Sequence, residues 1–182
     1  MKFIHLTICL IIIVTLNSCR KENSPSTKQN NSEKSILKKY SEMSLPYTDS
    51  TNFDNFSFRK KYLTKVEVGN LELARIFANM NYSKEAKFFI KHRISLSEKY
   101  NSIVAVCASE NEMYTMLINY NNQLKVIDFK EIAYDEIAES CQRKISKISK
   151  NNLEVTERDF CDGSVTKQNF EIRSNGKIRA SH

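Results

Sequence analysis

The chain has 182 residues, of which 28 are basic and 21 acidic, so its formal net charge is +7 at pH 7. Its three glycines are too few for a phosphate-cradling loop, and no Gly-x-Ser-x-Gly nucleophile motif is present. The basic residues are scattered and form no aromatic-interleaved arginine stripe, so we expect no nucleic-acid partner.

The N-terminus has the pattern of an export signal. Lys2 precedes an apolar run that ends at Leu16, and polar residues follow without interruption. The apolar segment 3–16 is shorter than the roughly 20 residues that a transmembrane helix needs. The pattern therefore predicts a signal peptide over residues 1–18.

The end of this run, Leu16-Asn17-Ser18-Cys19, resembles the lipobox of bacterial lipoproteins. The resemblance implies cleavage between Ser18 and Cys19 and covalent lipid on the Cys19 thiol, the only non-protein group expected. It also implies the cell envelope as location and the membrane as a partner. Arg20, in place of an aspartate, favours the outer over the inner membrane. An ordinary secretory signal with an incidental cysteine is the alternative.

Residues 19–34 are polar and carry Pro, Ser, Asn, Gln and Lys, which is typical of a flexible tether. Residues 35–182 are long enough for a single domain with its own core. Its excess of basic residues suits an anionic glycolipid or an acidic envelope protein as a further partner.

Two helices are predicted at the start of the domain. Apolar residues recur at helical spacing in 35–43 and again in 71–80. Between these segments lie Phe53, Phe56 and Phe58, for which packing beneath a sheet is favoured over an exposed binding patch.

Strands are predicted from residue 88 onward. Phe88, Ile90, His92, Ile94 and Leu96 alternate with polar residues, which predicts one inward face that includes His92. An apolar run at 103–107 follows. Three hairpins come next: 113–120 with 123–129, 143–149 with 153–157, and 170–173 with 177–180 around Asn175-Gly176.

The predicted fold class is mainly β (α+β). We expect an antiparallel meander, either an open twisted sheet or a partly closed barrel, with one or two short N-terminal helices. The segment Leu124-Lys125-Val126-Ile127-Asp128 follows a tyrosine-containing strand. In this it is similar to small secreted bacterial proteins of unknown function, a resemblance that implies a meander and no activity.

Cys107, Cys141 and Cys161 remain after the signal segment and the lipidated residue. Because Cys107 ends an apolar run, we expect it to be a buried thiol. Cys141 and Cys161 flank a predicted hairpin and are the better candidates for a disulfide. No Cys-x-x-Cys spacing occurs and histidines are scarce, so no metal site is expected.

Two function classes are compatible with these residues. The favoured one is a non-enzymatic binding module, because neither a nucleophile motif nor a candidate catalytic histidine is found. The alternative is an envelope-polymer hydrolase that uses two carboxylates of the 135–162 region. The candidate carboxylates are Asp135, Glu136, Glu139, Glu157, Asp159 and Asp162.

Overall fold

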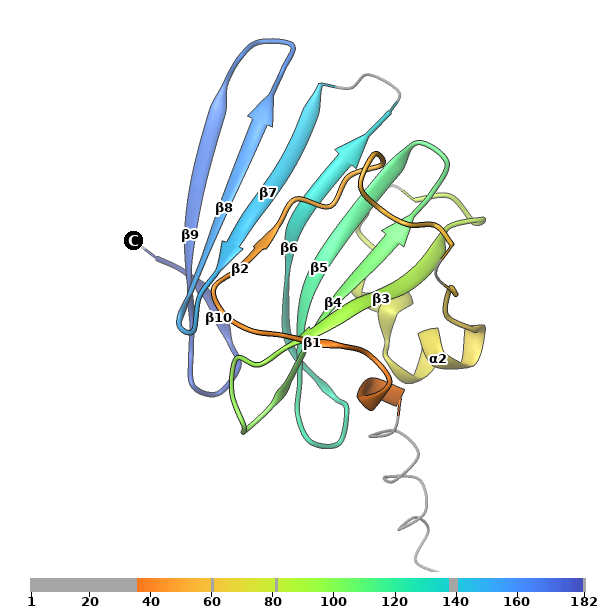
Figure 1. Cartoon of the computed structure of the whole chain (residues 1–182), viewed down its shortest axis with the longest axis vertical. Helices are drawn as coiled ribbons and strands as arrows, with labels where there is room; N and C mark the ends of the chain where they lie inside the picture. The colour runs from red at the N-terminus through yellow and green to blue at the C-terminus, as the bar shows by residue number, and fades with distance from the viewer. Residues whose placement is uncertain (1–35, 60, 81, 138–140, 182) are drawn as a thin grey trace, which may run out of the picture.

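The computed structural model describes residues 36–59, 61–80, 82–137 and 141–181 (Figure 1). The predicted signal peptide 1–18, Cys19 and the tether to residue 34 lie outside these ranges, and so does Glu139. Within the described residues, no helix has both the length and the apolar character needed to cross a bilayer.

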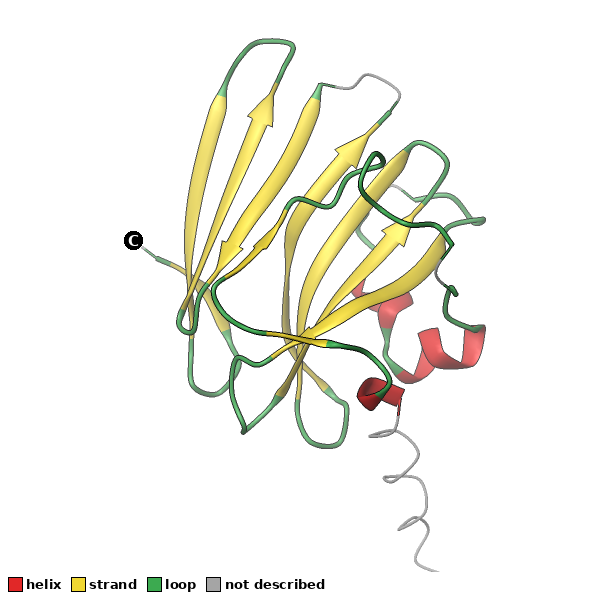
Figure 2. Ribbon diagram, in the orientation of Figure 1, coloured by secondary structure: helices red, strands yellow, loops and turns green. Residues whose placement is uncertain are grey.

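Strands dominate the described part of the chain, and the helices are short (Figure 2). Residues 36–38 form a single helical turn. The strands are β1 (Glu42–Met43), β2 (Tyr47–Asp49), β3 (Lys87–Ile94), β4 (Asn101–Ala108), β5 (Glu112–Tyr120), β6 (Val126–Glu136), β7 (Gln142–Ile148), β8 (Asn152–Asp159), β9 (Val165–Ile172) and β10 (Ile178–Ala180). The helices are α2 (Lys65–Asn70) and α3 (Leu73–Ile76).

The strands form one open sheet in the order β1-β3-β4-β5-β6-β7-β8-β9-β10. From β3 to β10 each strand pairs antiparallel with the next, whereas β1 runs parallel to β3. This confirms the prediction of a mainly β fold built on an antiparallel meander.

Two sets of contacts connect parts of the sheet that are distant in the strand order. β6 and β7 pair over only two positions, and β2 pairs with the far end of β7 through Tyr47 opposite Ile148. At the C-terminal end, the Asn119 side-chain amide donates to the Gly176 carbonyl (2.8 Å), and the Ile178 amide donates to Asp128 (3.0 Å). Side-chain hydrogen bonds thus bring the last hairpin back to β5 and β6, although the backbone ladder stays open.

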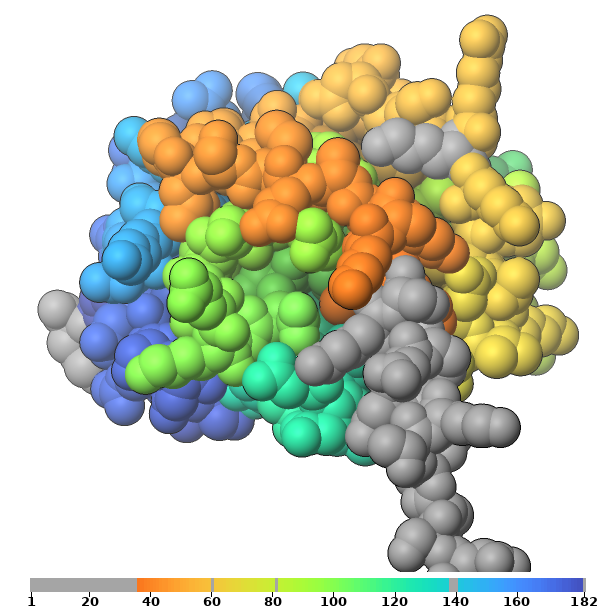
Figure 3. Space-filling view, turned by 60° about the horizontal axis from the view of Figure 1, so that its bottom comes forward, coloured from red at the N-terminus to blue at the C-terminus, as the bar shows by residue number. Residues whose placement is uncertain are grey.

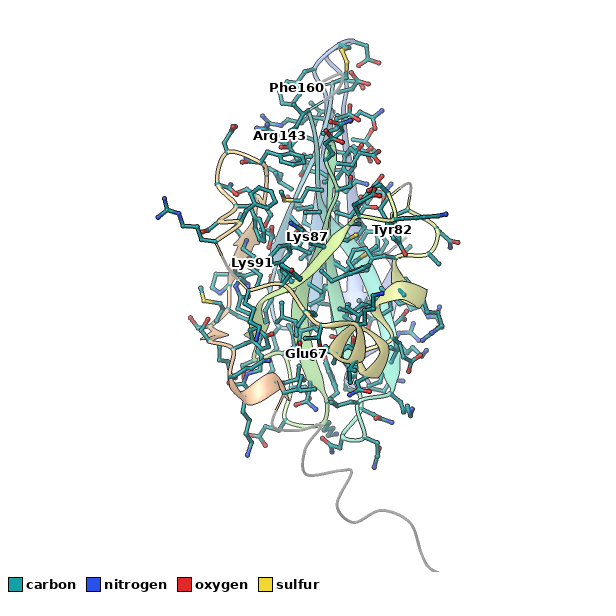
Figure 4. All side chains as sticks on the ribbon, turned by 90° about the vertical axis from the view of Figure 1, so that its right-hand side faces the viewer. Glu67, Tyr82, Lys87, Lys91, Arg143 and Phe160 are labelled. Carbon is teal, nitrogen blue, oxygen red and sulfur yellow. A yellow bond between two sulfur atoms is a disulfide. The ribbon has the colours of Figure 1, made fainter. Side chains whose placement is uncertain are left out.

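The sheet has a hydrophobic core on each side. One core lies under α2 and α3 and includes Leu71, Phe77 and Ile118. The other includes Leu117, Ile148 and Tyr47, the last contributed by the N-terminal segment that crosses the sheet in Figure 1. Figure 4 shows this segment and α2 on opposite sides of the strands.

The predicted single inward face of residues 88–96 is wrong. The pairing of β3 with β4 shifts register between Ile90 and His92, so Lys91 lies at a β-bulge. Phe88 and Ile90 consequently pack in the core beneath the helices, and Ile94 packs in the opposite core. The alternation of apolar and polar residues continues through the bulge in the sequence, because both faces of this sheet are covered and each needs apolar residues.

The predicted helices are also shorter than expected. The segment 35–43 is helical only at 36–38, because the Arg93 amide bonds the Ser41 carbonyl and β1 joins the sheet. The predicted helix 71–80 becomes α3, since Glu72 has a positive φ of 52° that separates it from α2. α2 itself begins at a capping box formed by Thr64 and Glu67.

The three predicted hairpins are present, but several boundaries differ. β6 continues to Glu136, beyond the predicted end at 129, and β9 begins at Val165, before the predicted start at 170. The Asn175-Gly176 turn is present, and Gly176 has the positive φ (83°) that favours glycine. β6, however, begins at Val126, three residues later than expected. The Asn121 side chain accepts hydrogen bonds from the Gln123 and Lys125 amides and so holds the intervening residues in a longer loop.

Candidate functional site

The largest hollow among those described opens at the β3 edge of the sheet and has a volume of about 520 Å³. We call it the basic hollow. It is lined by Lys39, Tyr40, Ser41, Lys61, Tyr62, Leu63, Glu67, Ile90 and Lys91. Figure 3 shows the segment that begins at residue 36 (orange) lying across the green and blue strands.

Backbone pairing on either side of the β3 bulge creates this hollow. The Ser41 carbonyl accepts a hydrogen bond from the Arg93 amide (2.9 Å) at one end. The Leu63 amide donates to the Phe88 carbonyl (2.7 Å) at the other end. Ile90 and Lys91 lie between these two contacts, so neither flanking segment covers the stretch of β3 that contains the bulge.

The charges that line the hollow are three lysines and one glutamate. Lys39 Nζ lies 2.7 Å from Glu67 Oε1, and the Thr64 amide donates to the other oxygen of the same carboxylate. The Lys39 hydrogen bond, followed by that of Thr64, lowers the pKa of Glu67 to about 2, against partial desolvation. Glu67 is therefore ionised at neutral pH and already bonded, which leaves the hollow with an excess of positive charge.

Lys91 connects the hollow to a buried polar cluster. Its ammonium lies 3.2 Å from Asp49, whose side chain is fully buried, and 2.7 Å from the Thr51 hydroxyl. The Tyr47 hydroxyl also donates to Asp49 (2.6 Å). Burial by itself raises the pKa of Asp49, but the Lys91 charge and the hydrogen bonds that Thr51 and Tyr47 donate to the carboxylate together leave that pKa below its ordinary value.

The first set of candidate carboxylates has structural partners. Asp135 is buried, lies 3.0 Å from the Arg143 guanidinium and accepts a hydrogen bond from the Phe53 amide (2.9 Å). Glu136 accepts from the Tyr134 hydroxyl (2.8 Å) and from the backbone of β7. These contacts hold the N-terminal segment and β7 against β6, and they leave neither carboxylate lining the basic hollow.

The second set lies at the far end of the long strands. Glu157 is 3.7 Å from Lys144. Asp159 accepts from the Cys161 amide and Asp162 from the Ser164 amide, so both carboxylates close the β8–β9 turn. In Figure 4 this end, marked by Phe160, is remote from Lys91 and Glu67.

The three cysteines of the domain and His92 occupy different environments. A disulfide joins Cys141 to Cys161, and Cys107 is a buried free thiol whose pKa is raised to about 12 by burial. His92 is buried and packs edge-on against Tyr47, with ring centroids 4.7 Å apart. In the ranges that the structure describes, no three His, Cys, Asp or Glu side chains are grouped as a metal site.

The three phenylalanines of the N-terminal segment do not share one environment. Phe56 is buried against Phe89, at 5.2 Å between ring centroids. Phe58 is 49% exposed and stacks on Phe53, and both line a second hollow of about 430 Å³. Packing therefore accounts for Phe56, whereas Phe58 presents an apolar surface to solvent.

The basic hollow was not found from the sequence. Lys39, Lys61 and Lys91 are far apart in the chain, and lysine is the commonest type of surface charge here. The β-bulge could not be recognised in the sequence, because Lys91 occupies an ordinary polar position in the alternating pattern. The nearest clue was the pair Lys61-Tyr62, which lies two positions before the helix cap Thr64.

Comparisons with known proteins add no family assignment. No protein-family model, no curated protein and no solved structure matches the chain.

Proposed function

We propose that this chain is a lipid-anchored protein of the cell envelope, with the outer membrane as the favoured location, whose β domain binds a ligand without catalysing a reaction. The anchor is supported by Leu16-Asn17-Ser18-Cys19 at the end of a short apolar run. Two or three acyl chains on Cys19 would hold the protein on the membrane, since one chain alone binds only marginally.

The observation that carries the binding role is the basic hollow beside the point where the tether reaches the domain. Lys39, Tyr40 and Ser41 line it and follow the tether within a few residues. A concave site with apolar walls and a few polar groups is the usual form of a ligand site. The hydrolase alternative has weaker support, because Asp135, Glu136 and Glu157 are each bonded to a separate structural partner.

Replacing Cys19 with alanine tests the anchor. The full chain is expressed in a bacterium fed radiolabelled palmitate, and the membrane and soluble fractions are compared. We expect wild type to carry label and to sediment with outer-membrane fractions. Cys19→Ala should lose the label and retain residues 1–18.

Cys9→Ala is the matched control, because Cys9 is the other cysteine of the N-terminal segment and lies inside the apolar run. It should be labelled like wild type. An unlabelled wild-type protein, or equal labelling of the Cys19 variant, would refute the lipid anchor.

A further inference from the structure

The basic hollow combines cationic, hydroxyl and apolar groups. Lys39 and Lys61 supply ammonium groups and Ser41 supplies a hydroxyl, whereas the Lys91 ammonium is already bonded to Tyr47, Asp49 and Thr51. Leu63 and Ile90 are buried apolar residues that contribute to its walls. Ammonium and hydroxyl groups donate hydrogen bonds, so the fitting ligand is an anion that accepts several of them and carries an apolar portion.

The single carboxylate of the lining does not cancel this preference. Glu67 is bonded to Lys39 at 2.7 Å and to both the amide and the hydroxyl of Thr64. Lys91 is paired with the buried Asp49, so the positive charge that remains in the lining is that of Lys61, and the chain as a whole has a net charge of +7. Partial enclosure by Leu63 and Ile90 makes the attraction for an anion stronger than at a flat, solvated surface.

The position of the hollow in the chain indicates where this anion comes from. Lys39 lies 20 residues after Cys19. A flexible linker of the length of residues 20–34 has a root-mean-square span of about 20 Å. Tethering over that distance gives effective concentrations on the order of millimolar, so even a weak site for a membrane component would be occupied.

We propose that the basic hollow binds the phosphate headgroup of an anionic lipid in the membrane that carries the tether. The inference rests on the proposed lipid anchor and goes beyond it by naming the ligand class. Lys61 and Lys39 hold the phosphate, and the side chains of Tyr62 and Leu63 face the glycerol and the first methylenes. The bound headgroup orients the domain with its β3 edge toward the bilayer.

Hydrogen exchange of the full chain in lipid nanodiscs tests this site. One set of discs contains phosphatidylcholine alone, and the other contains phosphatidylcholine with phosphatidylglycerol. We expect backbone amides of residues 39–41, 61–63 and 90–91 to exchange about tenfold more slowly in the anionic discs. That factor is the value for a ligand present at ten times its Kd. Amides of β8 and β9 should exchange equally in both.

Lys61→Glu should abolish the added protection. The matched control is Lys125→Glu, which makes the same charge change at an exposed residue outside the hollow and should keep the protection. Tyr62→Ala is a second variant that removes a lining side chain without changing charge, and it should weaken the protection. The exchange of β4 and β5 amides in the same data reports whether each variant is folded.

Three results would overturn the proposal. They are equal protection in the two kinds of disc, equal loss in Lys61→Glu and Lys125→Glu, and full protection by soluble glycerol phosphate in phosphatidylcholine discs. The last result would identify a free phosphate ligand instead of a lipid. Failure of the anchor is seen separately, as absence of palmitate label, so a labelled protein without headgroup-dependent protection would refute this inference alone.

Discussion

The Lys91 ammonium lies 3.2 Å from the Asp49 carboxylate, joining the bulge of β3 to a strand 42 positions earlier in the chain. Asp49 is fully buried, whereas the Lys91 side chain is 24% exposed and borders the basic hollow. One ion pair therefore connects the N-terminal segment that crosses the sheet to the candidate site.

Asp49→Asn should destabilise the domain by about 2–4 kcal/mol. The substitution removes one partner of a mostly buried ion pair, which typically costs 3–5 kcal/mol, and the partial exposure of Lys91 reduces that figure. Urea unfolding followed by circular dichroism measures the change. Asp54→Asn, at an exposed turn position, is the control and should alter stability by less than about 0.5 kcal/mol. Similar losses in both variants would contradict this role of Asp49.

The same ion pair predicts loss of stability in acid. The pKa of Asp49 is lowered in the folded protein, so its contribution is complete above the unfolded value of about 3.9 and is lost as pH falls through the folded pKa. The free energy of unfolding should therefore decline below about pH 4. The decline should be shallower in Asp49→Asn, as measured by urea unfolding across this pH range. Parallel pH profiles for the two proteins would rule out Asp49 as a contributor.

Removing the disulfide should lower stability by about 3 kcal/mol. Cys141 and Cys161 are separated by 20 positions, and closing a loop of this length restricts the unfolded chain by roughly that amount. A Cys141→Ser, Cys161→Ser double variant, compared with wild type in thermal and urea unfolding, measures the effect. Cys107→Ser is the control. Its difference in stability from wild type should be the same with and without reductant, because the Cys107 thiol is buried and free. No change of wild-type stability on reduction would contradict the prediction.

Gly176 and Gly69 should respond to alanine in opposite directions. At Gly176 a Cβ would lie 3.1 Å from Ile127 Cδ1, and the φ of +83° is unfavourable for alanine. We expect Gly176→Ala to cost about 1–2 kcal/mol or more. Gly69 lies in α2, and beyond its chain neighbours and the backbone of its own helix no atom lies within 4 Å of the added Cβ, so Gly69→Ala should stabilise by up to about 1 kcal/mol. Urea midpoints that shift in the same direction for both variants would disprove this contrast.

The fold class was predictable because its signals are local. The Asn175-Gly176 turn and the apolar runs of β4 and β5 are each encoded by neighbouring residues. The exact helix ends were not predictable. The Arg93 amide donates a hydrogen bond to the Ser41 carbonyl, so residue 41 lies beside β3 and does not continue the helix. This competition between helix and sheet depends on a contact between residues that are distant in the sequence.

The candidate site was beyond the reach of local patterns. The carboxylates of 135–162 stood out as a cluster in the sequence, but the fold distributes them among separate structural contacts. The lysines of the hollow, by contrast, looked unremarkable in the sequence. Lys91 lies at the bulge of β3 and lines the same hollow as Lys39 and Lys61, which come from other segments.

By itself, the sequence determined that the domain is an antiparallel meander, and its N-terminus predicts an export signal and a lipid anchor. Residue type and spacing suffice for these inferences, because turns, strand alternation and export signals act over a few neighbouring residues. Only the tertiary structure decided that Lys91 meets Asp49 and borders a basic hollow. Such long-range contacts depend on register and on burial on both sides of the sheet, and a one-residue bulge changes both.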